Sequence, residues 1–332
     1  MRNRTAEPRR RSIAGGGSTA LQTSIAGGGS AARRGSAARR RIAVAAAATL
    51  AAATIAVPAA LAATDGAAAK KGAAWLARAV PAATGTGQSA DTAVALRAAG
   101  TLSSADAAAR ANGLRKGARA YAVTPGAAGK VALGLVALGA SDPGCAGGVD
   151  LVAKLRPKGN GRFGTTIFDQ TLAILALKAL HRPIPSTAVR YLQRIRGAGG
   201  WSVLASQSDD VSSTAMAILA LRAAGVSAKQ ATLVKGVAWL GAQRTASGGF
   251  ALGRKDRSES NSTALAIQAY AALGRHDDRA LRALRGLQRG DGSFNFAPTD
   301  SGSRVIASTD AVAALAGKHP PVVSLRRPAG GC

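Results

Sequence analysis

Between residues 68 and 318, apolar segments with helical spacing alternate between two kinds. The first kind mixes Lys and Arg with apolar positions, which is typical of a helix with one face in solvent. The second kind, such as AMAILALRAA at 215–224, is apolar nearly all round and carries one late cation. A helix of this second kind must be covered on more than one side. We therefore expect these helices to form an inner ring inside an outer ring of the first kind.

The two kinds pair into six consecutive helical hairpins. We expect the first helices at Ala68–Val80, Ala105–Val123, Val149–Arg156, Ser186–Arg196, Lys235–Arg244 and Asp277–Arg289. We expect the second helices at 91–100, 131–139, 169–180, 213–225, 262–274 and 308–316. One such hairpin cannot bury its own apolar faces, so it needs copies of itself on either side.

The hairpins recur at a nearly constant interval. The second helices are expected to end at Gly100, Gly139, Leu180, Gly225, Gly274 and Gly317. The intervals are 39, 41, 45, 49 and 43 residues, which is typical of a repeat protein with two helices per unit. Gly is the expected stop after an apolar helix, and Asp, Ser and Thr before the second helices are expected N-caps. The pattern predicts an all-α repeat domain, either a closed barrel or an open solenoid.

Several units share a motif around an aromatic turn. It comprises Lys235-Gly236, Trp239-Leu240, Gln243 and Gly248-Gly249-Phe250, with a second copy at Tyr191-Leu192-Gln193 and Gly199-Gly200-Trp201, and a weaker third at Leu287-Gln288 and Gly292-Ser293-Phe294. The motif resembles the QW repeat of squalene–hopene cyclases and the prenyltransferase/squalene-cyclase superfamily. This resemblance covers about 68–318 and implies an α/α-toroid (an α6–α6 barrel). We interpret Trp201, Phe250 and Phe294 as wedges between neighbouring hairpins, and Trp75 and Trp239 as further structural residues of the repeat.

The residues before the repeats have a different composition. Residues 1–41 are rich in Arg, Gly and Ser and predict a disordered leader. Residues 42–62 form a short apolar core that ends in Ala60-Leu61-Ala62, which is typical of a signal peptide cleaved before Ala63. An uncleaved N-terminal anchor is the alternative. We therefore expect a secreted or cell-surface protein with its toroid at 63–318, a Pro/Arg/Gly tail at 319–332 and no membrane span after processing.

The chain is strongly basic, with a net charge of +28. Such a charge attracts anionic polymers or lipids, and an anionic cell-envelope polymer is one candidate partner. No RNP, KH, zinc-finger or basic-region motif is present, so we do not expect nucleic acid to bind.

The catalytic motifs of the superfamily are not met in this sequence. Class II terpene cyclases use a D-x-D-D motif, whereas Asp209-Asp210 follows Gln207, and 3 Trp, 3 Tyr and 5 Phe are too few for a cation-stabilising cavity. Zinc would need spaced ligands, and Cys145, His181, His276, His319 and Cys332 offer no such pair. The chain also lacks the Cys-Gly-Glu-Gln type of thioester motif. We expect no metal, and no catalytic residue is assigned.

The two cysteines, Cys145 and Cys332, suggest a disulfide in an exported protein. An intermolecular bond or a free thiol at the last residue are the alternatives.

Polar residues recur near the starts of the inner helices: Asp91, Asp169, Gln170, Asp210, Glu259, Asn261 and Thr263. They are expected either to cap these helices or to gather as a polar rim around one mouth of the barrel. The rim would then bind a ligand.

The leading hypothesis is an exported, non-catalytic toroid that binds a ligand or partner at the barrel mouth. The alternatives are a prenyltransferase/terpene-cyclase-type enzyme acting on an isoprenoid, and a structural cell-surface module that binds anionic envelope polymer. No cofactor is predicted. The resemblance to the helical domain of cobalamin carriers keeps cobalamin as a candidate, but a partner chain would have to supply their second domain, because only PPVVSLRRPAGGC follows the last repeat. A lumen filled with side chains would leave no room for a ligand.

Overall fold

A computed structural model describes residues 59–252, 257–299, 302–322 and 332, which belong to one compact unit, Ile55–Cys332. The expected leader, most of the expected signal segment and residues 323–331 of the tail lie outside the described residues. Twelve helices and one pair of very short strands make up this part of the chain. None of the helices described is long and apolar enough to cross a membrane.

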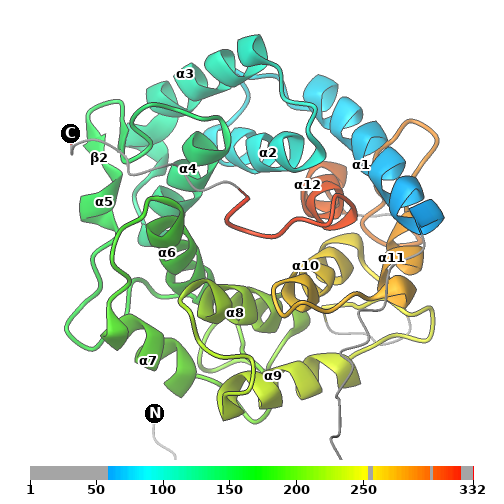
Figure 1. Cartoon of the computed structure of the whole chain (residues 1–332). Coiled ribbons are helices and arrows are strands. Elements are labelled where there is room, and N and C mark those ends of the chain that lie inside the picture. Colours follow the sequence, from blue (N-terminus) through cyan, green and yellow to red (C-terminus); the bar gives the residue numbers. More distant parts are fainter. Residues whose placement is uncertain (1–58, 253–256, 300–301, 323–331) are drawn as a thin grey trace, which may run out of the picture. The chain divides into compact units, whose positions relative to one another are not determined.

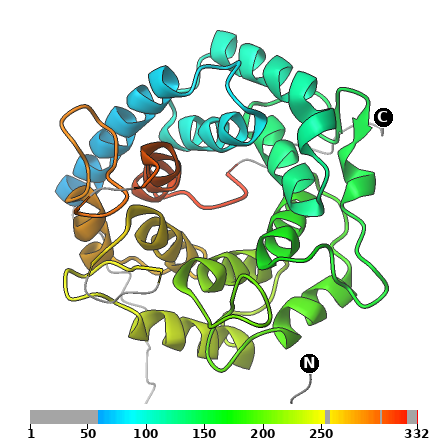
Figure 2. The same ribbon diagram turned by 180° about the vertical axis from the view of Figure 1, so that it is seen from behind.

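The helices alternate between an outer and an inner ring (Figures 1 and 2). The outer helices are α1 (Ala59–Ala79), α3 (Ser104–Tyr121), α5 (Leu151–Lys154), α7 (Ser186–Arg194), α9 (Ala231–Ala242) and α11 (Asp278–Arg285). The inner helices are α2 (Thr86–Ala99), α4 (Pro125–Ala137), α6 (Ile167–Ala179), α8 (Val211–Ala223), α10 (Ser260–Ala271) and α12 (Arg304–Leu315). Each inner helix packs against the next, and α12 packs against α2, so the ring is closed. The predicted all-α toroid is therefore confirmed, and the open solenoid is excluded.

Small residues let the inner helices approach one another closely. A Cβ on Gly129 of α4 would lie 2.8 Å from the backbone oxygen of Leu172 in α6. A Cβ on Gly134, one turn later, would lie 2.9 Å from the Cα of Ala90 in α2. Neither distance is tolerated by a real side chain, so glycine at these two positions sets how tightly α4 fits between its neighbours.

All six inner helices begin earlier than the sequence pattern predicts, and the difference is four to six residues in α2, α4 and α12. α2 begins at Thr86, so Asp91 lies within the helix and does not open it, as we had expected. α4 begins at Pro125, before the expected start at 131, because the Thr124 side chain caps the helix by accepting from the N–H of Ala127. Proline suits the first position of a helix since its missing N–H would have no partner there.

The third unit departs most from prediction. Its outer helix, expected over Val149–Arg156, is reduced to the four residues of α5. Gly147 and Gly148 both have positive φ and form a tight turn, which pairs β1 (Cys145–Ala146) antiparallel with β2 (Val149–Asp150). The strand uses residues that would have begun the helix. The inner helix of this unit ends at Ala179 with Leu180 as its C-cap, and the next residue, His181, is left-handed.

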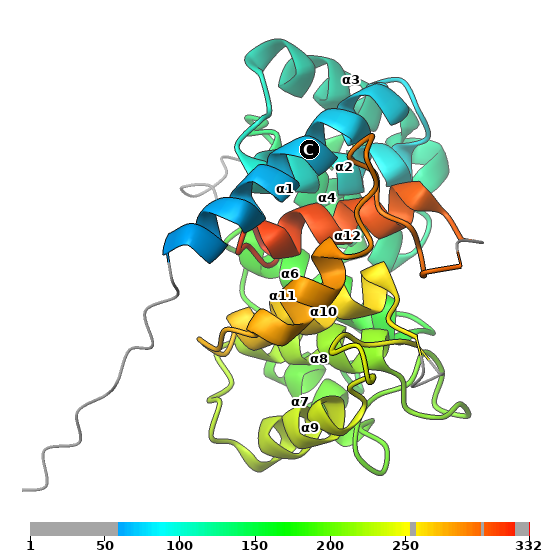
Figure 3. The ribbon, with the colours of Figure 1, turned by 90° about the vertical axis from the view of Figure 1, so that its right-hand side faces the viewer.

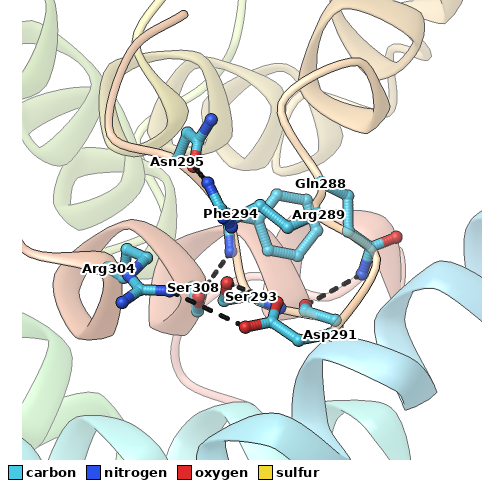
Figure 4. Close-up of polar contacts among 9 residues, drawn as sticks. Gln288, Arg289, Asp291, Ser293, Phe294, Asn295, Arg304 and Ser308 are labelled. Carbon is cyan, nitrogen blue, oxygen red and sulfur yellow. Dashed lines mark hydrogen bonds and ion pairs between the residues drawn. The ribbon is translucent and has the colours of Figure 1, made fainter. Parts of the chain in front are cut away.

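The aromatic turn of four units is attached to its own inner helix by the same hydrogen bond. In each, an early polar side chain of the inner helix accepts from the backbone N–H of the aromatic residue. The four pairs are Phe163 with Gln170, Trp201 with Thr214, Phe250 with Thr263, and Phe294 with Ser308, at 2.9–3.0 Å. Figure 4 shows the last pair, beside the Arg304–Asp291 ion pair at 3.7 Å. We call this contact the turn lock.

Two of these aromatic residues, Trp201 and Phe294, pack against a neighbouring unit. The ring of Trp201 would lie 2.6 Å from a Cβ on Gly236 of α9, and Trp239 of α9 would lie 2.8 Å from a Cβ on Gly200. The two indoles therefore interlock consecutive units, with Trp201 fully buried and Trp239 half-buried. Trp75, in the corresponding position of α1, packs against the small core cluster around Leu76.

The same packing joins the last unit to the first. Phe294 would lie 3.1 Å from a Cβ on Gly72 of α1. Arg285 of α11 forms an ion pair with buried Asp65, and the Gln288 side chain donates to the backbone oxygen of Ala68 at 2.9 Å. Figure 3 shows α1 lying outside α12 and α2. All of these α1 contacts lie beyond Ala63, so cleavage at the expected site would preserve them.

Candidate functional site

A cavity runs through the middle of the inner ring, and we call it the lumen. Its outer part has a volume of about 520 Å³ and its inner part about 100 Å³. Both parts share the same central residues: Asp91, Lys130, Leu172, Met216, Leu265, Thr309 and Asp310. The side chains of the inner helices therefore do not fill the ring, and a volume of this size is within the range of small-molecule sites.

The two ends of the lumen differ. The outer part opens where α2, α6 and α12 begin, beside Gly87, Phe168 and Ile306, with Tyr121 of α3 packed on Gly87. The inner part is bounded by Pro320 and Val322, which follow α12. Figure 1 shows this segment extending from α12 into the middle of the ring. The lumen is therefore open at one mouth and covered by the chain at the other.

A disulfide joins the end of the chain to the outer ring. Cys332 is bonded to Cys145 at the start of β1, with 5.3 Å between their Cα atoms and a sequence separation of 187. Val322 therefore lies at the lumen, and Cys332 is held at the third unit.

Most of the lumen wall is aliphatic, but three charged side chains face it from separate helices. The Lys130 ammonium of α4 donates to the Asp91 carboxylate of α2 at 2.8 Å, and the two side chains are 28% and 39% exposed. Asp310 of α12 lies in the same wall. No described residue donates a hydrogen bond to its carboxylate. Of the two carboxylates, Asp91 is paired with Lys130, and Asp310 has no described hydrogen-bond donor.

The surroundings change the pKa of two of these groups. Burial in the lumen and the nearby Asp91 charge raise the pKa of Asp310 to about 7, against a smaller opposing effect of Lys130. Burial lowers the pKa of Lys130, but the charge and hydrogen bond of Asp91 outweigh it and leave the pKa raised. Near neutral pH, Lys130 is therefore charged, while Asp310 is partly protonated.

Of the seven residues expected in a polar rim, only Asp91 lines the lumen. Buried Asp169 accepts from the N–H groups of Gly126 at 3.0 Å and of Thr165 and Thr166 at 3.1 Å. Burial raises its pKa, but the hydrogen bonds from Thr166 and Gly126 hold the pKa below its usual value. Gln170 is also buried; besides its turn lock, it donates to the backbone oxygen of Ala188 at 3.1 Å. Both residues join helices and do not face a ligand site.

The remaining rim candidates belong to helix starts as well. Asp210 caps α8 by accepting from the N–H of Ser213 at 2.8 Å. Glu259 precedes α10 and accepts from the N–H of Leu252 at 2.9 Å. Thr263 makes a turn lock, and the side-chain oxygen of Asn261 is buried without a described partner. Of these four residues, Asp210 caps its helix, whereas Glu259 and Thr263 hold the turn that precedes α10.

The Asp209 side chain supports a turn of the fourth unit. The Asp209 carboxylate accepts from the N–H groups of Gly199 at 3.0 Å and Gly200 at 2.9 Å, so it shapes the turn before Trp201. No group of three or more His, Cys, Asp or Glu among the described residues could hold a metal ion.

Sequence reasoning did not identify Lys130 and Asp310. Each is a single charge within an apolar inner helix, in GKVALGLVA and STDAVAAL. A charge at the centre of a helix that is otherwise buried indicates a partner or a cavity. That pattern could have found both residues.

The described residues define the class: an α/α-toroid with an open, mainly aliphatic lumen. Its fold is similar to that of the type II terpene cyclase MstE from Scytonema, with a TM-score of 0.58 and 17% identity over 78% of this chain and 98% of that chain. A structure of the same cyclase with geranylgeranyl dihydroxybenzoate gives a TM-score of 0.58 and 15% identity, over 78% and 99% of the two chains. Haptocorrin in complex with Cbi gives 0.49 and 12%, over 76% and 67%.

These identities establish a shared fold and nothing more specific. The toroid expected from the QW-like motif is therefore confirmed, whereas a shared fold does not decide between catalysis and binding. Neither a family profile nor a curated protein matches the sequence.

Proposed function

We propose that this protein binds a small, elongated and largely apolar ligand in its lumen without transforming it. The observation that carries the proposal is the unfilled cavity, whose wall includes Leu133, Leu172, Met216 and Leu265. In a closed ring of apolar helices, side chains large enough to fill the centre would stabilise the fold more than a void does. An open lumen with an accessible mouth therefore favours a binding role.

The size of the lumen sets the expected affinity. Each buried methylene contributes about 0.8 kcal/mol, so an eight-carbon chain would gain about 6 kcal/mol. Part of that gain is offset by the entropy lost on association. A simple aliphatic probe should accordingly bind with a dissociation constant of roughly micromolar to millimolar.

The test is a calorimetric titration of the protein with octanol. Met216→Trp would fill the centre of the lumen, and we expect it to abolish binding while the helical circular dichroism is retained. Val234→Trp, on the exposed face of α9, is the matched control and should bind like the parent. Met216→Phe is a smaller filling variant in case the tryptophan is not tolerated. The proposal is refuted if octanol does not bind to the parent. It is also refuted if octanol binds equally to both filling variants and to the control.

The second candidate is acid-catalysed chemistry on an isoprenoid, and Asp310 is the observation that favours it. A carboxyl group with its pKa raised to about 7 can donate a proton near neutral pH. The only aromatic side chains among the described lumen residues are Tyr121 and Phe168, which offer little stabilisation to a carbocation. Incubation with geranylgeranyl dihydroxybenzoate, followed by mass spectrometry, distinguishes the two. Product that disappears in Asp310→Asn would favour the enzyme.

We infer that cobalamin is not the ligand of this lumen. A corrinoid is a rigid macrocycle fringed with amides, whereas the uncharged polar groups of the inner lumen are Gln268 and Thr309 in an aliphatic wall.

We also propose that the protein acts outside the cytoplasm, on the basis of the signal-like segment at 42–62 and the disulfide. N-terminal sequencing of the secreted protein should find Ala63 as its first residue.

A further inference from the structure

We propose that the lumen selects amphiphiles with a protonated amine head group, and that Asp310 is the residue that selects them. This inference rests on the proposed binding function and names the chemical class of its ligand. It follows from the unequal partnering of the three charged groups around one aliphatic cavity.

The positive charge of the lumen is already engaged. Lys130 donates to Asp91 at 2.8 Å, so these two side chains neutralise each other. Asp310 remains as the acceptor without a described hydrogen-bond donor. An unpaired carboxylate in an apolar wall needs hydrogen-bond donors and a compensating positive charge. An alkylammonium group supplies both, since it has three N–H donors and a positive charge.

The charged groups that face Asp310 favour an ammonium ligand over an anionic one. Asp91 faces it from α2 and Lys130 from α4, with Tyr121 of α3 at the mouth. From α10, Gln268 donates to the backbone oxygen of Asp310 at 3.2 Å and leaves the carboxylate free. From α1 the contact is apolar, through Gly72 and the side chain of Val312. A carboxylate or phosphate ligand would meet two carboxylates and a single lysine that is already paired.

The exterior of the protein cannot supply the same preference. The chain carries a net charge of +28, which repels cations at long range. Salt limits that field to about 8 Å at physiological ionic strength. A preference for an ammonium ligand over a neutral one would therefore have to arise within the lumen.

The experiment compares octylamine, octanol and octanoate by calorimetry at about pH 8, where Asp310 should be ionised and octylamine protonated. The three probes share one aliphatic chain and differ in the head group. We expect octylamine to bind at least about tenfold more tightly than octanol, which corresponds to about 1.4 kcal/mol, and octanoate to bind most weakly.

Two variants assign the preference to its residue. Asp310→Asn should remove the preference, so that this variant binds octylamine no more tightly than it binds octanol. Asp278→Asn, at an exposed aspartate of α11 outside the lumen, should keep the parent preference. Asp91→Asn should also weaken the preference, since it frees Lys130 to pair with Asp310.

The outcomes separate this inference from the function on which it rests. If octanol and octylamine bind equally to the parent, or if Asp310→Asn keeps the preference, the amine assignment is wrong and the lumen remains a binding site. Tightest binding of octanoate would assign recognition to Lys130 and also overturn it. If none of the three probes binds, the proposed function itself fails.

Discussion

Thr263 holds the aromatic turn of its own unit through two hydrogen bonds to Phe250. Its hydroxyl accepts from the backbone N–H of Phe250 at 2.9 Å and donates to the backbone oxygen of the same residue at 3.1 Å. Both residues are fully buried. The hydroxyl thereby satisfies a donor and an acceptor that water cannot reach, and it fixes the ring that packs at the centre of the unit.

Replacing Thr263 by valine should destabilise the protein by about 1–3 kcal/mol, because the buried N–H of Phe250 would lose its acceptor at nearly constant volume. The Phe250 carbonyl would keep the hydrogen bond that it accepts from the N–H of Glu259 at 2.7 Å. Urea denaturation followed by circular dichroism measures the change. Thr263→Ser keeps the hydroxyl and should cost clearly less. An equal loss in both variants would mean that the methyl group, and not the turn lock, stabilises this unit.

The end of α6 carries the one non-glycine residue with positive φ among the described residues, His181 at 52°. The corresponding residues of the other units are Gly100, Gly139, Gly225, Gly274 and Gly317, all left-handed. His181→Gly should therefore stabilise the protein by about 0.5–1 kcal/mol, since glycine reaches this conformation without strain.

Gly225→Ala provides the converse measurement. A Cβ at this position would have no heavy atom within 4 Å, so the cost is conformational alone. We expect a loss of about 1 kcal/mol. If His181→Gly is destabilising instead, the imidazole makes a favourable interaction that exceeds the strain of its backbone.

The raised pKa of Asp310 predicts a pH dependence of stability. In the folded protein the Asp310 carboxyl keeps its proton up to its pKa of about 7, whereas in the unfolded chain it releases the proton near its ordinary pKa of 3.8. The folded state therefore binds more protons between these values, and the free energy of unfolding should fall as pH rises from about 4 to 7. Each unit of pKa difference corresponds to about 1.4 kcal/mol, so urea denaturation at several pH values can detect the slope.

Asp310→Asn should flatten this slope and stabilise the protein at about pH 8, because no charge is then buried in the lumen wall. Asp278→Asn is again the exposed control. A slope that persists in Asp310→Asn would place the titrating group elsewhere. The opposite contribution of Asp169, whose pKa is lowered, should appear only in more acidic solution.

The Cys145–Cys332 bond closes a loop of 187 residues, which includes most of the ring. Cys332→Ser should lower the free energy of unfolding by about 3–5 kcal/mol, because a long loop is released in the unfolded chain. Reductant should produce the same loss in the parent and no further loss in the variant. Mass spectrometry should find one added hydrogen per cysteine on reduction, and a parent mass that reductant does not change would contradict the bond.

Much of the fold follows from residues that lie close together in the sequence. The alternation of amphipathic and wholly apolar segments, the interval of about forty residues and the glycine stops depend on contacts within one or two helical turns. They fixed the number of hairpins and which helix of each pair lies inside. The aromatic turns at Trp201, Phe250 and Phe294 were found for the same reason, since each packs near a short glycine motif.

Closure and the site were decided by residues far apart in the chain. Arg285 reaches Asp65 and Gln288 reaches Ala68 across 220 residues, and no periodic pattern encodes such a meeting. Asp91, Lys130 and Asp310 likewise come from three helices that face one another only because the ring closes. The sequence by itself determined a repeating pair of helices. Only the tertiary structure decided that six pairs leave an open lumen, because the space at the centre depends on ring closure and on which side chains point inward.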